Sequence, residues 1–183
     1  APFSEPLYGS VSEAQIQFKK NPVKYPPEEI PENYTSFFQQ WNSSSRKMIL
    51  VGVLPPNSIE KRFIEAIAAD ESIIVLTETT SNLHHTNFFP AIDQLIAPLD
   101  EEAFKALQPD LLVTFGGMIV SKKIKTFLRS YKPKMHWHVD TKKAYDTFFN
   151  LKHHFDVTPN AFLNEFLFKT EKASSTYRYH WQL

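Results

Sequence analysis

Apolar residues along the chain fall into short continuous runs separated by segments with helical spacing. The runs 47–53, 72–78, 110–115 and 135–140 have the length and composition of strands that are buried on both faces. A shorter run at 152–157 predicts a fifth strand. Because these runs hardly alternate with polar residues, the pattern predicts a sheet that is covered on both sides.

Helical periodicity occupies the segments between the runs. Apolar residues recur at spacings of three and four in 31–44, 57–70, 121–131 and 159–170, and 91–107 predicts one or two short helices. The 57–70 helix is expected to begin at Asn57 or Ser58, since both residue types cap helix starts. Alternating strands and helices predict an α/β fold, a Rossmann-like three-layer sandwich with a mostly parallel sheet of five or six strands.

The first thirty residues differ from the rest of the chain. Prolines at positions 2, 6, 22, 26, 27 and 31 disfavour a helix. We therefore expect residues 1–30 to form an extended interdomain arm and 31–183 to form one domain. The chain lacks an initiating methionine, so we also expect it to be a piece of a longer protein.

Composition narrows the function classes. The 183 residues contain 20 basic and 20 acidic side chains, which leaves no net field to attract nucleic acid or an anionic membrane. The absence of cysteine excludes disulfides, thiolate metal sites and cysteine nucleophiles. No apolar run approaches the roughly 20 residues that span a bilayer. These features predict a cytoplasmic protein with no nucleic-acid partner and no membrane insertion.

Polar residues or paired glycines stand at the ends of three of the predicted strands, at 78–82, 116–117 and 140–143. Ligands of open parallel sheets bind beyond the carboxyl ends of the strands. A free-standing nucleotide- or cofactor-binding module is one function compatible with this arrangement. No G-x-S-x-G element is present to indicate a serine nucleophile.

The segment FGGMIVSKK (115–123) combines two glycines with two lysines. It matches neither G-x-G-x-x-G nor a P-loop. Ser121 stands where a helix would begin, which puts Lys122 and Lys123 in its first turn. Lysines there oppose the helix dipole, a mild cost unless an anion is near. The segment is therefore either an anion-binding turn or a turn with solvated lysines, and the general behaviour of surface charge favours the second.

The segment HWHVD raises the question of a metal site. Strand alternation puts His136, His138 and Asp140 on one face, and His153 and His154 follow nearby in the sequence. An H-x-H-x-D pattern occurs in binuclear metallohydrolases, but no companion motif supplies further ligands. Ordinary histidines at a strand edge are the alternative.

Four segments together carry a resemblance to a known family. PFSEPLYG (2–9), ETTSNL (78–83), FGGMIVSKK (115–123) and WHVD (137–140) resemble the central domain of the 2-succinyl-5-enolpyruvyl-6-hydroxy-3-cyclohexene-1-carboxylate synthases, the thiamine-diphosphate enzymes of menaquinone biosynthesis. The resemblance covers essentially the whole chain, and its most specific parts are the first segment and the lysine turn.

The resemblance implies that the chain is the central domain of a three-domain transferase. Thiamine diphosphate and Mg²⁺ would be held by N- and C-terminal domains outside this chain, so the chain alone is expected to bind no cofactor and to be inactive. The full-length homo-oligomer would decarboxylate 2-oxoglutarate and add the succinyl carbanion equivalent to isochorismate.

The resemblance also implies a substrate site. The lysine turn would hold substrate carboxylates through Lys122 and Lys123. The family has Lys-Arg at this position, and a lysine at 123 cannot reproduce the bidentate grip of an arginine. Further residues expected to line the site are Ser81, Asn82, Gly117 and Ser121.

Overall fold

The computed structural model describes residues 34–182. The expected arm at 1–30 lies outside the described residues. No helix in the described range is long and apolar enough to cross a membrane.

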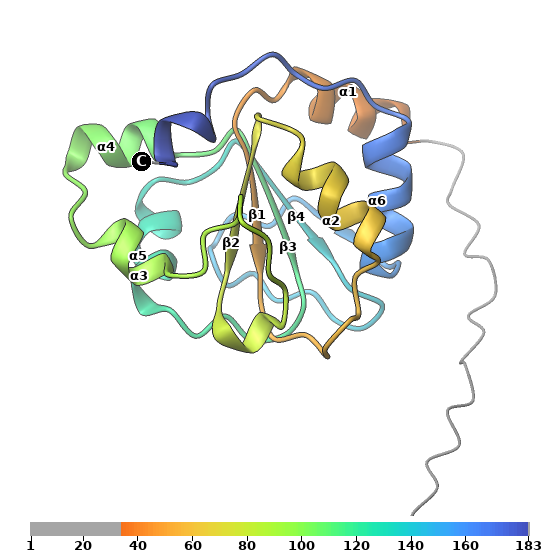
Figure 1. Cartoon of the computed structure of the whole chain (residues 1–183), viewed down its shortest axis with the longest axis horizontal. Helices are drawn as coiled ribbons and strands as arrows, with labels where there is room; N and C mark the ends of the chain where they lie inside the picture. Colours follow the sequence, from red (N-terminus) through yellow and green to blue (C-terminus); the bar gives the residue numbers. More distant parts are fainter. Residues whose placement is uncertain (1–33, 183) are drawn as a thin grey trace, which may run out of the picture.

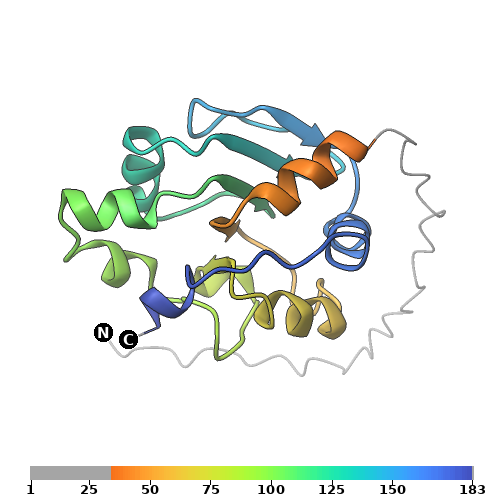
Figure 2. The ribbon, with the colours of Figure 1, turned by 90° about the horizontal axis from the view of Figure 1, so that it is seen from above.

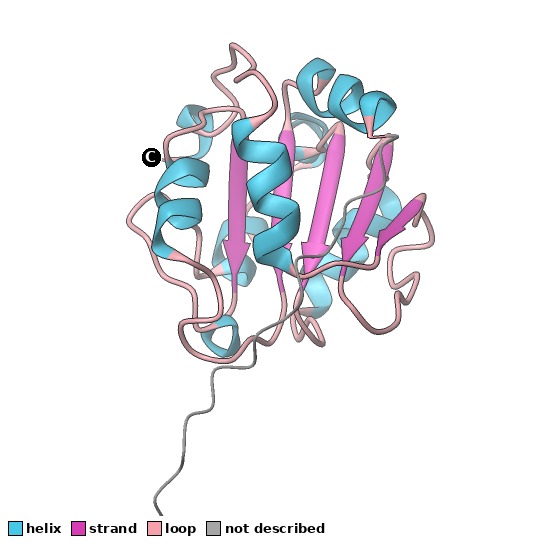
Figure 3. Ribbon diagram, turned by 90° about the vertical axis from the view of Figure 1, so that its right-hand side faces the viewer, coloured by secondary structure: helices cyan, strands magenta, loops and turns pink. Residues whose placement is uncertain are grey.

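Five parallel strands form the centre of the molecule (Figure 3). Their order across the sheet is β2-β1-β3-β4-β5. Every residue of β1, β2 and β3 is buried, which agrees with the continuous apolar runs. The strands are β1 Lys47–Val51, β2 Ile73–Thr77, β3 Leu111–Phe115, β4 Met135–Val139 and β5 His153–Phe155.

Helices cover both faces of the sheet and confirm the three-layer α/β prediction (Figure 1; Figure 2 shows the same division from above). One face is covered by α1 Thr35–Ser43, α2 Lys61–Ala68 and α6 Pro159–Phe168. The other is covered by α3 Ile92–Ile96, α4 Glu101–Leu107 and α5 Lys122–Ser130. Two short 3₁₀ turns, η1 Thr79–Ser81 and η2 Tyr179–Trp181, complete the described elements.

The face under α1, α2 and α6 is rich in aromatic side chains. Phe162 and Phe166 stack with ring centroids 4.3 Å apart, and Trp137 from β4 lies 5.5 Å from Phe166. Trp41 from α1 is 5.4 Å from the same ring. Aromatic pairs of this kind add to the stability that area burial supplies. The aromatic spacing in the sequence is therefore largely explained by the core.

Helix α2 begins later than expected. Asn57 has a φ of 57°, a left-handed conformation that does not continue into a helix. Asn160 of α6 fixes the segment before α2, because its amide accepts a hydrogen bond from the Glu60 backbone N at 3.1 Å and donates one to the Ser58 backbone O at 3.0 Å. The expected start at Asn57 or Ser58 was wrong because this contact spans 100 residues of sequence.

The strand order creates a switch point between β1 and β3. From β1 the chain crosses to β2 on one side and then returns to β3 on the other side. The helices that follow β1 and β3, α2 and α5, therefore pack on opposite faces of the sheet, the arrangement at which ligands of open parallel sheets bind.

Candidate functional site

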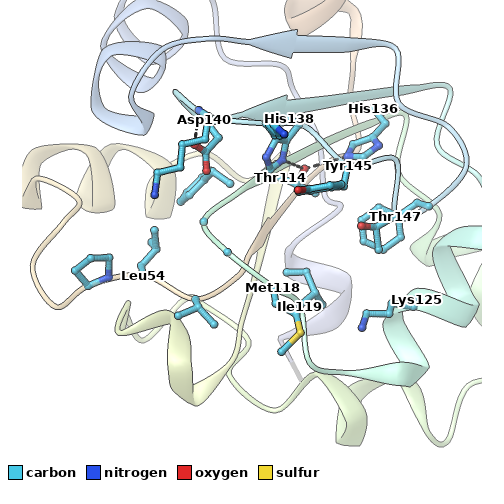
Figure 4. Close-up of a pocket in the computed structure, with 18 residues that line it drawn as sticks. Leu54, Thr114, Met118, Ile119, Lys125, His136, His138, Asp140, Tyr145 and Thr147 are labelled. Atoms are coloured by element: carbon cyan, nitrogen blue, oxygen red, sulfur yellow. Dashed lines mark hydrogen bonds between the residues drawn. The ribbon is translucent and has the colours of Figure 1, made fainter.

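A cavity of about 840 Å³ lies at this switch point (Figure 4). Its walls come from the β1–α2 loop, the β3–α5 loop, the end of β4 and the loop that follows β4. Gly117 is among its lining residues, as are the titratable residues Lys125, His136, His138, Asp140, Lys142, Lys143 and Tyr145.

Three polar side chains form the inner wall of the cavity. The hydroxyl of Thr114 on β3 lies 3.0 Å from Nε2 of His136 and 2.9 Å from Nδ1 of His138, both on β4 (Figure 4). Trp137 and Val139 point to the aromatic face instead, as strand alternation predicted. A hydroxyl can donate to one ring and accept from the other. This geometry therefore couples the tautomers of the two histidines, because one of the two facing ring nitrogens carries a proton and the other does not.

Burial favours the neutral form of both histidines. Burial, together with the neighbouring His138, lowers the pKa of His136 to about 4. Burial also lowers the pKa of His138. Nδ1 of His136 is buried and has no hydrogen-bond partner within residues 34–182.

The histidines do not converge on a metal position. Across the described part of the chain, no group of three or more His, Cys, Asp or Glu side chains is placed to hold a metal ion. Nε2 of His154 lies 2.7 Å from the backbone oxygen of Asp140. His153 packs against Phe37 and Phe155, with centroids 4.4 Å from each. Within the described residues, the H-x-H-x-D segment therefore forms no set of metal ligands, and the structure does not support the metallohydrolase hypothesis.

Three lysines contribute positive charge to the cavity wall. Lys125 is half-buried, and Lys142 and Lys143 are exposed. Lys125 is not among the site residues that the sequence predicts, although it stands three residues after Lys122, within one helical turn. Lys142 and Lys143 belong to the polar residues that the sequence places at the end of a strand. Together they make the cavity suited to an anionic group.

Glycines allow the two loops beside the cavity to touch. A Cβ at Gly52 would lie 2.1 Å from the backbone oxygen of Gly117, so no larger residue fits there without a shift. The Gly117 backbone N donates to the Val53 backbone O at 2.8 Å. Gly116 has a φ of 82°, which favours glycine. The paired glycines Gly116 and Gly117 thus allow the β3–α5 loop to pack closely against the β1–α2 loop.

Helix α5 begins at the expected position. Ser121 is its N-cap residue, and its hydroxyl accepts a hydrogen bond from the Ile124 backbone N at 3.2 Å. The same hydroxyl donates to the carboxylate of Asp93 on α3. The carboxylate of Glu78 accepts hydrogen bonds from the backbone N of Val120 and from that of Ser121. Two carboxylates of the protein itself, those of Glu78 and Asp93, therefore lie at the start of α5.

Lys122 and Lys123 lie in the first turn of α5 and are exposed. Neither is among the residues that line the large cavity. Within residues 34–182, neither side chain forms an ion pair or a hydrogen bond. Their contact with a substrate stays a prediction.

The four expected site-lining residues are placed differently. Ser81 is buried, and its hydroxyl donates to the Val51 backbone O at 2.7 Å. Asn82 has a φ of 48°, and its amide donates to the Leu54 backbone O at 2.8 Å. Ser121 lines a neighbouring pocket of about 350 Å³, and Gly117 lines the large cavity. The first two support the loops, and the other two face open space.

Comparison with known proteins places the chain in a family. A family model described as "Middle domain of thiamine pyrophosphate" matches residues 19–182. The chain belongs to this family. The fold described above, a parallel sheet between two helical layers, is thus that of a thiamine pyrophosphate middle domain.

Three proteins similar to this chain are each named 2-succinyl-5-enolpyruvyl-6-hydroxy-3-cyclohexene-1-carboxylate synthase. The protein from Flavobacterium johnsoniae is 52% identical over 179 residues, which is 97% of this chain and 32% of that protein. The one from Christiangramia forsetii is 52% identical over 160 residues, covering 82% and 27%. The one from Porphyromonas gingivalis is 32% identical over 171 residues, covering 90% and 28%. The resemblance found in the sequence is confirmed.

This middle domain spans about a third of the length of the curated relatives it matches. About two-thirds of each of these relatives therefore lies outside the region that matches this chain.

Proposed function

We propose that the chain is the middle domain of a 2-succinyl-5-enolpyruvyl-6-hydroxy-3-cyclohexene-1-carboxylate synthase. The observation that carries this proposal is 52% identity over 97% of the chain to a protein of that name. The full-length transferase would decarboxylate 2-oxoglutarate and transfer the remaining four-carbon unit to isochorismate in menaquinone biosynthesis. The middle domain would brace the other domains and contribute to substrate binding.

Lys122 and Lys123 are the residues proposed to meet the substrates. Both substrates carry carboxylates, and an ammonium group forms charge-assisted hydrogen bonds with such groups. Support comes from their position at the carboxyl edge, their exposure and the lack of any competing partner within the described residues. Lys123 offers a single point charge where the family motif has an arginine, so its contact would be less directional.

Thiamine diphosphate and Mg²⁺ would bind to parts of the full-length protein outside this chain. Within residues 34–182, no group of three or more His, Cys, Asp or Glu side chains is placed to hold a metal ion. When bound, the cofactor supplies the carbon nucleophile that this chain's residues lack. The partners of this domain would thus be the N- and C-terminal domains of the same protein, in a homo-oligomer.

The direct test is an assay of the purified full-length protein with 2-oxoglutarate, isochorismate, thiamine diphosphate and Mg²⁺. Product should require both substrates, and omission of isochorismate should abolish it. The isolated chain should show no turnover under the same conditions. A folded, cofactor-loaded full-length protein that makes no product from the two substrates would contradict the proposal.

The cavity supports a second candidate function, a nucleotide- or cofactor-binding module. Its position at the switch point and its three lysines suit a phosphate-bearing ligand. Calorimetric titration of FAD, NAD and ADP into the chain tests this candidate. Micromolar binding that is weakened in a Lys142→Ala/Lys143→Ala variant would favour the module, and no binding of any of the three would remove it.

A further inference from the structure

The side chain of Glu78 joins two loops at the carboxyl edge. Glu78 follows β2, whereas Val120 and Ser121 precede α5, and β1 lies between β2 and β3 in the sheet. The Val120 backbone N donates to both oxygens of the Glu78 carboxylate, at 3.0 and 2.9 Å, and the Ser121 backbone N donates to Oε1 at 2.7 Å. Hydrogen bonds to an ionised acceptor are among the strong ones in proteins. The contact therefore fixes the two residues directly before Lys122.

Glu78 is in turn anchored to the sheet. Its backbone N donates to the hydroxyl of Ser81 at 2.9 Å, and that hydroxyl donates to the backbone oxygen of Val51, the last residue of β1, at 2.7 Å. Ser81 is fully buried. A continuous set of hydrogen bonds thus runs from the end of β1 through Ser81 and Glu78 to the start of α5.

This contact decides which groups can meet a substrate anion at the turn. Backbone N–H groups at a helix N-terminus often bind an anion directly. Here the backbone N–H groups of Val120 and Ser121 already donate to the Glu78 carboxylate. The hydroxyl of Ser121 donates to Asp93 and accepts from the Ile124 backbone N. The groups that remain for an external carboxylate include the ammonium groups of Lys122 and Lys123.

We propose that Glu78 is a positioning residue, whose carboxylate holds the start of α5 so that Lys122 and Lys123 are presented to the carboxylates of the substrates. This inference rests on the proposed function. It also accounts for two lysines at the positive end of a helix, because Glu78 and Asp93 provide the compensating negative charge without any ligand.

Chemical rescue in the full-length enzyme tests the inference. The Glu78→Ala substitution removes two carbons and two oxygens, the heavy atoms of acetate. KM for at least one carboxylate substrate should rise about fivefold to tenfold while kcat changes less, because the lost interaction positions a binding group. Millimolar acetate should restore much of the lost kcat/KM, and sodium chloride of equal ionic strength should not. Acetate should not activate the wild type.

Two further variants keep the test decisive. Asp100 at the start of α4 accepts a hydrogen bond from the Ala103 backbone N at 2.8 Å, so Asp100→Ala removes a similar contact at a distant helix and should leave KM unchanged. If Glu78→Ala does not fold, Glu78→Gln keeps the side-chain volume. It should raise KM and speed deuterium exchange in peptides covering 116–123.

The outcomes separate the inference from the proposed function. An unchanged KM in a folded Glu78 variant, alongside a raised KM in Lys122→Ala, would overturn the role of Glu78 and leave the proposed function standing. A raised KM with no acetate rescue and unchanged exchange over 116–123 would also overturn it. Unchanged kinetics in the Glu78, Lys122 and Lys123 variants would overturn the inference together with the proposed substrate contacts.

Discussion

Lysines near the amino ends of the strands, here called the amino edge of the sheet, differ in their surroundings from lysines near the carboxyl ends, the carboxyl edge. At the amino edge, Lys47 is fully buried, with Nζ 2.7 Å from the hydroxyl of Ser72 and 5.4 Å from the centroid of the Trp41 ring. Lys134 lies 3.0 Å from the carboxylate of Asp110. At the carboxyl edge, by contrast, Lys122 and Lys123 have no such partner within the described residues.

The comparison distinguishes a lysine that stabilises the fold, Lys47, from lysines whose charge is free of protein partners within the described residues, Lys122 and Lys123. A buried ammonium with its partner in place is costly to disturb, because removing it leaves a void and unpaired groups. An exposed, unpaired lysine contributes little to folding. Substitution of the buried Lys47 should therefore lower stability, and substitutions of the exposed Lys122 and Lys123 should lower substrate binding.

The largest effect is expected at Lys47. Lys47→Ala should lower the free energy of unfolding by about 2–5 kcal/mol, the range for large-to-small changes in a core. Lys47→Met keeps most of the volume without the buried charge and should cost clearly less. Urea unfolding of the chain measures both. Equal stability of Lys47→Ala and the wild type would show that the buried lysine does not hold this edge.

The histidine pair should make stability depend on pH. The pKa of His136 is lowered from 6.5 to about 4, so between these values the unfolded chain binds a proton that the folded chain does not. The free energy of unfolding should therefore fall as the pH falls through this window, by on the order of 2–3 kcal/mol from this residue. His136→Gln should show a shallower fall in urea titrations between pH 7 and 4. Parallel curves for the two proteins would contradict the assignment.

A smaller effect is expected where the loops touch at the carboxyl edge. Gly52→Ala should lower the free energy of unfolding by about 1–3 kcal/mol, because its Cβ would overlap the backbone oxygen of Gly117. Gly117→Ala is the matched control, since its nearest contact would be Cβ of Val53 at 3.3 Å. Thermal unfolding should rank Gly52→Ala below Gly117→Ala, and the reverse order would be contrary to the described packing.

Much of the fold could be predicted because local patterns dominate it. The buried runs determined the strands, and Ser121 at the start of a periodic segment gave the start of α5 correctly. The start of α2 was missed because Asn160, from a distant helix, fixes the segment before it. Lys47 stood at the polar end of its apolar run, and nothing in that run showed that its ammonium would be buried beside Ser72.

The site was less predictable because its contacts join distant segments. Strand alternation put His136 and His138 on one face, but it could not reveal that Thr114 bridges them. The resemblance pointed to the lysine turn. It could not reveal that Glu78, more than forty residues earlier, holds that turn, because this contact depends on the strand order. Spatial information of this kind is absent from local periodicity.

The most direct test of the contrast between the edges compares the two ends of one helix in the full-length enzyme. Lys122→Ala and Lys123→Ala alter the carboxyl-edge start of α5, and Lys132→Ala alters an exposed lysine just beyond its other end. Steady-state kinetics with 2-oxoglutarate and isochorismate should show that kcat/KM falls about tenfold or more, equivalent to about 1.4 kcal/mol, in at least one of the first two variants and not in the third. Unchanged kinetics in folded Lys122→Ala and Lys123→Ala would contradict the account and leave these lysines as solvated surface charge.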